Sequence, residues 1–586
     1  MVEPSQRSTH APESARVLVI GLDGATYRLI SPLAAAGQLP NLQRLMQNGA
    51  AGVLQSTIQP SSEQAWATFM TGQNNGRHGV YGFQQRRPGT YQFSYVNGHS
   101  IRAPSLWRLL SQRGRDVIVI NVPMTYPPQP VRGVLIGGLL SPGVHSDFTY
   151  PPGLYAELRQ ACGDYVIDVD IERGQLSDDQ LADTVEAALR MIRLRTCATL
   201  HLARTRPWDL LMTVYGASDR LAHKFWKHWD PNHPLHTPEL AAAFGDVLPR
   251  VYRELDAAVG ELLAELVDER TTVFIVSDHG FGGMEKAVYL NRWLMHQGYL
   301  TLKSGVPRDV RRWPQLVVRS ALRQGRSLLA NPALAQVKQW AFARFPRLKG
   351  DLYSSVAFAQ VDWTRTRAYA LGNMGNIYLN LQGREPAGIV APGTTASALQ
   401  DELIAALRGL INPDSGTPVF HTIYRGADLY HGPYVGDGPD IVGVKDCRYH
   451  VVTADWQRGD DIVAPLGSVM HFAADQSGQH ELEGVVMASG PGVRRGVEIG
   501  TARLLDAAAT ILYALHEPIP ADMDSRVIDA LFEPTLLAQR PPKLASRYQS
   551  AAPDDDEQSD PPDLSDYTDS EAAQVRDRLI ALGYLD

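Results

Sequence analysis

Residues 271–280 read TTVFIVSDHG, in which six β-branched or aromatic residues are followed at once by polar ones. Such a run favours a buried strand that ends in a loop. The pattern recurs in VLVIGLDGA at 17–25 and in WDLLMTVYGASD at 208–219, with helical periodicity between the runs. This alternation predicts an α/β fold, with a mostly parallel sheet and helices on both faces. Because the carboxyl ends of parallel strands meet at one edge, the acidic residues that follow these runs should converge there: Asp23, Asp219 and Asp278.

The composition is typical of a soluble globular protein, with 44% hydrophobic and 20% charged residues in a chain of 586. No apolar run is long enough to cross a bilayer, and residues 1–16 lack the apolar core of a signal peptide. The three cysteines, Cys162, Cys197 and Cys447, are widely spaced and leave an odd thiol. We therefore expect neither a disulfide framework nor a cysteine metal cluster, and we expect a cytoplasmic location.

Charge and composition divide the chain into segments. We predict a flexible N-terminus at 1–15, a catalytic domain at 16–540, a disordered acidic linker at 541–566 and an amphipathic C-terminal helix at 567–586. Eight acidic residues and no basic one lie between 554 and 569, which equals the whole net charge of −8. Such a segment cannot bury enough apolar surface to fold. We therefore expect the chain after residue 545 to be dispensable for the catalytic fold and for activity on small substrates. The alternative is that the terminal helix docks elsewhere in the fold through Leu579, Leu582, Tyr584 and Leu585.

A basic segment at 303–365 interrupts the alternating pattern, and we interpret it as a helical insertion or cap. Between 303 and 349 it holds eleven basic residues and one acid, with tryptophan and phenylalanine among the arginines. Three interpretations are open: an interfacial helix that makes peripheral membrane contact, a cap whose arginines collect an anionic substrate, and a solvated basic face. No nucleic-acid partner is expected, because the segment resembles no known binding module.

Six potential metal ligands follow predicted strands. Asp219 and His223 are four residues apart, so one helical turn would place them on one face. Three carboxylates and three imidazoles form a mixed oxygen and nitrogen set, which suits zinc, or manganese, better than calcium. Two such ions can hold the attacking and leaving oxygens of an in-line displacement. Each residue alone could equally be a turn residue, a helix cap or a buried histidine; the set is Asp23, Asp219, His223, Asp278, His279 and His480.

The segment PSSEQAWATFMTG at 60–72 contains two candidate nucleophiles, Ser61 and Ser62, just before a predicted helix. A serine hydroxyl needs a base or a metal to attack at neutral pH, and a helix N-terminus attracts phosphate. The alternative is that these serines only cap the helix. The local sequence alone does not choose between the two hydroxyls.

These motifs, in this order, resemble the type I phosphodiesterase and nucleotide pyrophosphatase branch of the alkaline phosphatase superfamily, and most of all a bacterial group of phosphohydrolases or phosphomutases. The resemblance covers about residues 16–530. It rests on GLDGA, LPNLQRLMQNGA, PSSEQAWATFMTG, RHGVYGF, NVPMTYPP, ASDRLAH, SDHGF and GQHELEGVVMASGPG. It implies the α/β core of that superfamily and a metal-dependent hydrolase of phosphate esters.

The resemblance also implies roles for single residues. Ser62, nine residues before Thr71, becomes the nucleophile, and it forms a phosphoseryl intermediate. Two divalent ions are implied, zinc in the first instance and manganese as the alternative. One ion is assigned to Asp23, Asp278 and His279 together with Ser62, and the other to Asp219, His223 and His480.

The implied substrate is a phosphorylated small molecule or a lipid-linked phosphate ester, and we favour a phosphodiesterase. A phosphomonoesterase or a phosphomutase could use the same residues, and a catalytically silent binding protein on the same fold is a further alternative. Nucleotide pyrophosphatases place a phosphate-binding asparagine near the position of Phe83, which cannot donate a hydrogen bond, so nucleotide substrates are in doubt. The sulfatase branch is disfavoured, because Ser62 is not followed by the x-Pro-x-Arg pattern that its modified nucleophile needs. Neither the substrate-binding residues nor the oligomeric state is predicted.

Overall fold

The computed structural model describes residues 15–169, 176–303, 358–453, 460–466, 476–545 and 567–585. Most of the predicted basic insertion and almost all of the acidic linker lie outside these ranges. The predictions made for those two segments therefore stay predictions.

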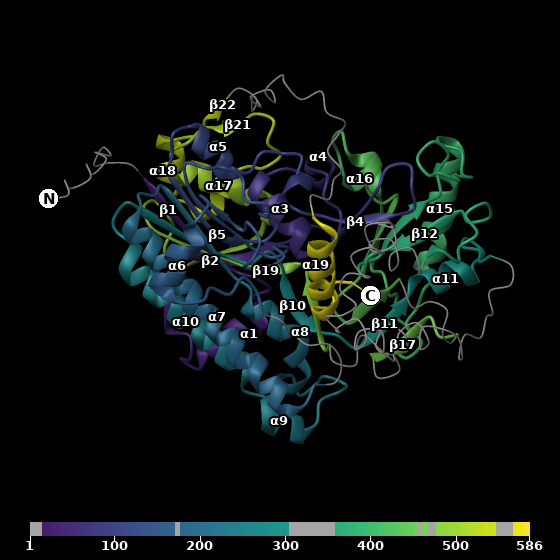
Figure 1. Ribbon diagram of the computed structural model, residues 1–586, viewed down its shortest axis with the longest axis horizontal. Coiled ribbons are helices and arrows are strands. Elements are labelled where there is room, and N and C mark those ends of the chain that lie inside the picture. The colour runs from purple at the N-terminus through teal and green to yellow at the C-terminus, as the bar shows by residue number, and fades with distance from the viewer. Residues whose placement is uncertain are drawn as a thin grey trace, which may run out of the picture.

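A nine-stranded sheet forms the core of the described chain (Figure 1). In spatial order its strands are β20 (Val497–Arg503), β2 (Ala50–Gln55), β19 (Glu483–Ser489), β9 (Thr271–Val276), β1 (Arg16–Leu22), β8 (Leu210–Tyr215), β5 (Val117–Val122), β6 (Gly133–Gly137) and β7 (Thr149–Tyr150). The strands from β9 to β6 are parallel to one another, whereas β19 and β7 run antiparallel to their neighbours.

Helices cover both faces of this sheet. On one face lie α1 (Tyr27–Ala35), α2 (Pro40–Asn48), α7 (Asp178–Thr205) and α10 (Val247–Leu266), and on the other lie α3 (Ser62–Thr71), α5 (Leu106–Gln112) and α17 (Ala507–Ala514) (Figure 1). Strands β5, β8 and β9 are buried along their whole length. A strand covered on both faces has no solvent side, which explains why these strands are continuous apolar runs. The predicted α/β fold with a mostly parallel sheet is confirmed.

The central strand β1 brings the predicted ligands together. It pairs with β8 on one side and β9 on the other, with Leu22 opposite Tyr215 and Gly21 opposite Val276. All three strands therefore end at the same edge. The turn after β1 needs a glycine, because Gly24 has a φ of +65° and a Cβ there would lie 3.0 Å from the Cβ of Asp219.

A second group of sheets lies beside the core sheet (Figure 1). Its larger member is antiparallel, in the order β12 (Ala368–Leu371), β13 (Asn376–Leu379), β15 (Ile441–Val444) and β14 (Thr422–Arg425), and packs with α11 (Leu290–His296) and α15 (Thr394–Arg408). A smaller sheet joins β16 (Tyr449–Val452), β11 (Lys286–Tyr289) and β17 (Val463–Pro465). The ribbon β10 (Gly280–Gly283) with β18 (Gly478–Glu481) returns the chain to the carboxyl edge of the core sheet. Further described elements are α4 (Asn75–His78), β3 (Gln84–Arg86), β4 (Phe93–Tyr95), α6 (Leu154–Cys162), α8 (Ala217–Trp229), α9 (Pro238–Phe244), α16 (Gly426–Leu429), β21 (Ile519–Pro520), α18 (Pro534–Gln539), β22 (Leu544–Ala545) and α19 (Asp569–Ala581).

The C-terminal helix α19 is docked, which is the alternative to a tail that lies free of the catalytic domain. It begins with a capping box at Thr568 and lies between the core sheet and the second group of sheets (Figure 1). Val575, Leu579 and Leu582 are buried in the main hydrophobic core. The apolar face of this helix therefore has a partner in the fold, and dispensability of the tail for activity stays a prediction.

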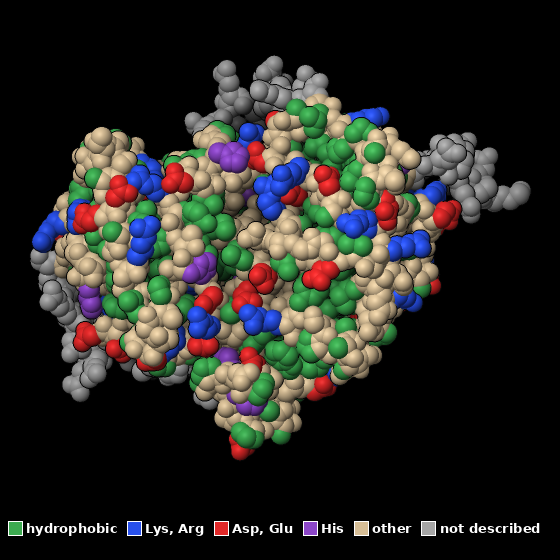
Figure 2. Space-filling model, turned by 180° about the vertical axis from the view of Figure 1, so that it is seen from behind, with side chains coloured by type: hydrophobic (Ala, Val, Ile, Leu, Met, Phe, Trp, Pro, Cys, Tyr) green, Lys and Arg blue, Asp and Glu red, His purple; other side chains and the backbone are tan. Residues whose placement is uncertain are grey.

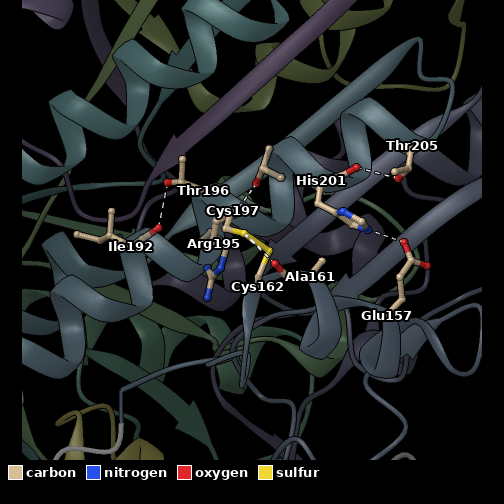
Figure 3. Close-up of a disulfide and its surroundings, with 10 residues drawn as sticks. Glu157, Ala161, Cys162, Ile192, Arg195, Thr196, Cys197, His201 and Thr205 are labelled. Atoms are coloured by element: carbon tan, nitrogen blue, oxygen red, sulfur yellow. Dashed lines mark hydrogen bonds and ion pairs between the residues drawn. A yellow bond between two sulfur atoms is a disulfide. The ribbon is translucent and has the colours of Figure 1, made fainter.

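One correction concerns the cysteines. Cys162 at the end of α6 and Cys197 in α7 form a disulfide, with 5.9 Å between their Cα atoms (Figure 3). Glu157 of α6 also bonds His201 of α7, at 2.7 Å. The bond was not expected because the spacing of three cysteines does not show which two meet. Disulfides persist in oxidising compartments, so this bond weighs against the cytoplasmic location, which stays a prediction.

Figure 2 shows one face of the molecule, on which acidic and basic side chains are interspersed. This distribution agrees with the balanced charge of the chain outside its acidic run. Within the described residues, no helix combines the length and the apolar character that a membrane span requires.

The disulfide predicts the thiol count of the unfolded protein. Unfolding without reductant should expose one reactive thiol, that of Cys447, and reduction should raise the count to three. The bond closes a loop of 35 residues, so Cys197→Ser should lower the free energy of unfolding by roughly 3–4 kcal/mol. Thiol titration in denaturant and a urea melt would measure both. Three thiols before any reductant is added would contradict the pairing.

Candidate active site

Three carboxylates meet at the carboxyl edge of the core sheet. Asp23 follows β1, Asp278 follows β9, and Asp219 lies in the first turn of α8, which follows β8. All three are almost completely buried. One oxygen of Asp23 accepts a hydrogen bond from Trp66 Nε1 at 3.2 Å, and one oxygen of Asp278 accepts one from the Gly24 backbone N–H at 3.2 Å. The other oxygen of each of these carboxylates, and Oδ1 of Asp219, is buried without a hydrogen-bond partner.

Three imidazoles face the same space with the same orientation. In each, Nδ1 lies against a backbone carbonyl: His223 against Gly478 at 3.1 Å, His279 against Gly280 at 3.1 Å, and His480 against Pro60 at 2.8 Å. A nitrogen opposite a carbonyl oxygen must carry the proton, so Nε2 keeps its lone pair. This is the arrangement that histidine ligands of metal ions adopt, with the second nitrogen held by the protein.

The predicted ligand sets are compact. In the set assigned to one ion, His279 Nε2 lies 3.2 Å from Asp278 Oδ2 and 3.9 Å from Asp23 Oδ1. In the other set, Asp219 Oδ1 lies 3.0 Å from His480 Nε2 and 3.6 Å from His223 Nε2. The two sets adjoin, because His279 Nε2 also lies 3.8 Å from Asp219 Oδ1. The geometry therefore offers two neighbouring positions for a cation and gives His279 access to both.

The two candidate nucleophiles differ in their contacts. Ser61 is the N-cap of α3, and its hydroxyl donates to Glu63 Oε2 at 2.5 Å. Ser62 is the first residue of α3, and its Oγ lies 3.2 Å from His279 Nε2. Ser62 therefore faces the ligand cluster, while the hydroxyl of Ser61 is engaged beside it. The Ser61 side chain does not cap α3, and the Ser61 carbonyl accepts the first hydrogen bonds, from the Gln64 and Ala65 N–H groups. The N–H groups of Ser62 and Glu63 therefore have no acceptor within the helix and can bind an anion.

The pKa values of the carboxyl and imidazole groups in this cluster indicate a site for a cation. Burial, followed by repulsion from Asp219, raises the pKa of Asp278 to about 8. Burial, followed by repulsion from Asp278 and Asp219, raises the pKa of Asp23 well above its ordinary value. Burial lowers the pKa of His480 to about 3 and that of His223 to about 4, which keeps both rings in the neutral form that binds metals. Three carboxylate oxygens without a hydrogen-bond partner and the Nε2 atoms of three imidazoles fit divalent ions of the zinc type.

Several residues that support the site were not predicted as part of it. Arg220 is fully buried and forms ion pairs with both Asp219 and Asp168. Tyr584, near the end of the chain, donates a hydrogen bond to Asp219 Oδ2 at 2.6 Å. Arg220 lies inside the ASDRLAH motif, but nothing in the neighbouring sequence indicates that its side chain is buried. Asp168 and Tyr584 are distant in sequence from the residues they contact, and nothing near them indicates these contacts.

A cavity lies beside the N-terminus of α3, where Glu63, the residue after Ser62, is part of its wall. The wall also includes Gln64, Phe83, Tyr378 and Tyr584. The rings of Phe83 and Tyr584 stack with their centroids 4.8 Å apart. Among the described residues that line this cavity there is no Lys, Arg or His.

Comparison with known families assigns the chain to a class of enzyme. The sequence model of the family described as type I phosphodiesterase / nucleotide pyrophosphatase matches residues 17–471, which is most of the chain. The chain therefore belongs to this family, and the resemblance seen in its motifs is confirmed. It is a phosphoric ester hydrolase, of a family whose members use divalent metals.

Solved structures with a similar overall shape have low sequence identity to this chain. Murine ectonucleotide pyrophosphatase / phosphodiesterase 5, solved as an inactive variant in complex with AMP, is 13% identical, with 86% of this chain and 95% of that chain covered and a TM-score of 0.45. Phosphonoacetate hydrolase from Sinorhizobium meliloti 1021, in complex with phosphonoacetate, is 14% identical, with 86% and 96% covered and a TM-score of 0.49. Human ectonucleotide pyrophosphatase / phosphodiesterase 5 is 13% identical, with 86% of this chain and 95% of that chain covered and a TM-score of 0.43. A comparison with functionally characterised protein sequences gave no match.

The two adjoining ligand sets predict two ions per chain when zinc or manganese is supplied. His480→Ala should lose one of them, because His480 Nε2 is the nearest ligand nitrogen to Asp219 Oδ1. His233→Ala is a matched control, since this buried imidazole bonds the carbonyl of Met284 instead of the cluster, and it should keep both ions. Elemental analysis of the desalted proteins would count them. Wild-type protein without bound metal under these conditions would contradict the interpretation.

Proposed function

We propose that this hydrolase is a phosphodiesterase that uses Ser62 as its nucleophile beside two divalent ions, zinc or manganese. Asp23, Asp278 and His279 would hold one ion together with Ser62, and Asp219, His223 and His480 would hold the other. The ions would lower the pKa of the Ser62 hydroxyl and offset the charge that builds up on phosphorus-bound oxygens. The supporting observation is the position of Ser62 Oγ, 3.2 Å from His279 Nε2 at the border of the two ligand sets.

The reaction of the chain's own residues has two steps. The Ser62 hydroxyl loses its proton as its oxygen attacks phosphorus and displaces the alcohol of the ester, and the departing alkoxide takes up one proton in exchange. Water then cleaves the resulting phosphoserine, which releases the remaining phosphate group and restores the hydroxyl. The N-terminus of α3 stabilises the phosphate oxygens in both steps, because its free N–H groups and the positive end of the helix dipole lie at the nucleophile.

The cavity beside Ser62 favours a diester over a monoester. A phosphomonoester presents a dianion, which enzymes commonly hold with arginine or lysine. The described lining of this cavity offers aromatic rings, side-chain amides and the carboxyl group of Glu63, with no cationic group. The stacked pair of Phe83 and Tyr584 suits an aromatic or apolar group esterified to phosphate. Phe83 stands near the position where nucleotide pyrophosphatases place an asparagine, so an apolar contact replaces a phosphate contact there.

A panel of substrates tests this function. Bis(4-nitrophenyl) phosphate, 4-nitrophenyl phosphate and a nucleoside 4-nitrophenyl monophosphate should be compared with the metal-loaded enzyme. We expect the aryl diester to have a kcat/KM at least about tenfold above that of the monoester, which corresponds to roughly 1.4 kcal/mol of transition-state stabilisation. Preference for the monoester would show a phosphomonoesterase, and no turnover of any ester would contradict the proposal.

The neighbouring serines provide a matched pair of variants. Ser62→Ala should lower kcat by roughly three orders of magnitude or more, since no nucleophile is left for the first step. Ser61→Ala should stay within about tenfold of wild type, because it removes only the hydrogen bond to Glu63. Both variants should keep their bound ions. Steady-state kinetics with the aryl diester would measure the effect, and comparable rates for Ser62→Ala and wild type would exclude Ser62 as the nucleophile.

A further inference from the structure

The C-terminal segment 582–585 enters the active site from the end of α19. The helix itself is anchored away from the ligand cluster, where Tyr567 donates to the Leu140 carbonyl at 2.7 Å and Arg578 donates to the Ser141 carbonyl at 2.6 Å. Beyond the helix the chain turns toward the cluster, and Tyr584 and Leu585 become part of the cavity wall beside Ser62. The segment thus links a distant docking site to the reaction centre.

The turn is held in place from two sides. Gln476, two residues before β18, donates to the Leu582 carbonyl at 2.8 Å, and Asn373 donates to the Gly583 carbonyl at 3.3 Å. Gly583 has a φ of +80°, and a Cβ at this position would lie 1.5 Å from Gln476 Nε2. Only glycine fits here without displacing Gln476. The path of the chain into the site is therefore fixed by specific contacts.

Tyr584 contacts three of the groups assigned to the second ion. Its hydroxyl donates to Asp219 Oδ2 at 2.6 Å and accepts from Arg220 Nη1 at 2.9 Å. Its ring meets the rings of His223 and His480 edge to face, with centroids 5.4 Å and 5.6 Å away. Tyr584 is only 2% exposed. The residue is thus packed against a carboxylate and two imidazoles at once.

The two carboxylate oxygens of Asp219 have different contacts. Oδ2 receives the hydroxyl of Tyr584 and the guanidinium of Arg220, whereas Oδ1 is buried, has no hydrogen-bond partner and faces the imidazole nitrogens. Hydrogen bonds to the outer oxygen of a ligating carboxylate fix its rotation and direct the inner oxygen at the metal. Without the hydroxyl, the carboxylate would keep only the donor of its sequence neighbour Arg220.

We propose that Tyr584 is a positioning residue for Asp219, and that segment 582–585 is therefore an integral part of the second ion's site. This inference rests on the proposed function for the identity of the ligands. Its physical basis is the pair of bonds at Asp219 Oδ2 together with the edge contacts to both histidines. A tail that merely filled the site mouth would need no hydrogen bond to the outer oxygen of a buried carboxylate.

Cobalt binding to the full-length protein tests the proposal without reference to turnover. Metal-stripped wild type, Tyr584→Phe and Tyr567→Phe should each be titrated with Co²⁺ alone, followed by the visible absorption of the bound ion. Tyr584→Phe keeps the ring and removes one oxygen. Tyr567→Phe is the matched control, because it removes a hydroxyl that anchors the same tail to a backbone carbonyl away from the cluster.

We expect Tyr584→Phe to weaken one of the two Co²⁺ binding steps by about 10–100-fold and to leave the other nearly unchanged. The absorption of the weakened ion should also change, because the orientation of one ligand is no longer fixed. Tyr567→Phe should bind both ions as wild type does, even if its thermal midpoint falls. Circular dichroism would show that both variants are folded.

Three results would overturn the proposal. The first is wild-type Co²⁺ affinity and spectrum in Tyr584→Phe. The second is an equal loss in Tyr567→Phe, which would show that docking of the tail, and not the hydroxyl at Asp219, is what matters. The third is a Tyr584→Phe enzyme that turns over faster than wild type with unchanged affinity, which would show that the tail obstructs the site. If wild type binds Co²⁺ in two steps but hydrolyses no phosphate ester, the proposed function fails while the effect on Co²⁺ binding can still be read.

Discussion

The structure depends on one electrostatic constraint, which is the burial of three carboxylates within a few ångströms of one another. Moving one ionised carboxylate out of water carries a penalty of several kcal/mol, and nearby like charges increase it. Asp23 and Asp278 are each held by a hydrogen bond to one oxygen, from Trp66 and from the Gly24 backbone. Their remaining oxygens lie 3.9 Å and 3.2 Å from Nε2 of His279, and neither has a hydrogen-bond partner. The fold is therefore balanced for a state in which cations lie among these groups.

The parallel sheet is what makes this concentration of charge possible. Strands β8, β1 and β9 end side by side, so each needs only one acidic residue in the following loop to place three carboxylates in one space. The ribbon of β10 and β18 then returns His480 to the same edge from a distant part of the sequence. Arg220 is fully buried beside Asp219 and also pairs with Asp168. Its positive charge offsets part of the negative charge of the carboxylates. A rigid scaffold and a few short loops thus define the whole first layer of the site.

The parts of this arrangement that the sequence predicted are those with local signals. Asp23, Asp219 and Asp278 follow apolar runs, so strand propensity and the rule about strand ends placed them together. Ser62 could be separated from Ser61 only through the family resemblance, and the structure adds the reason, which is that the Ser61 hydroxyl already bonds Glu63. The pairing of Cys162 with Cys197 and the contact of Tyr584 with Asp219 were not predicted. Both depend on tertiary contacts, and Tyr584 lies 365 residues from Asp219 in the sequence.

The spread of the site along the chain couples ion binding to the completion of folding. The groups proposed to hold the second ion come from α8, from β18 and from the turn after α19, and those proposed for the first ion follow β1 and β9. A folding intermediate that lacks any of these long-range pairings lacks part of the donor set, so it cannot bind both ions tightly. Contacts between residues this far apart in the sequence form late in folding, because the chain must lose loop-closure entropy before these contacts can stabilise it. Only fully folded chains would then bind both ions tightly. By mass action, this binding would shift the folding equilibrium toward the folded state.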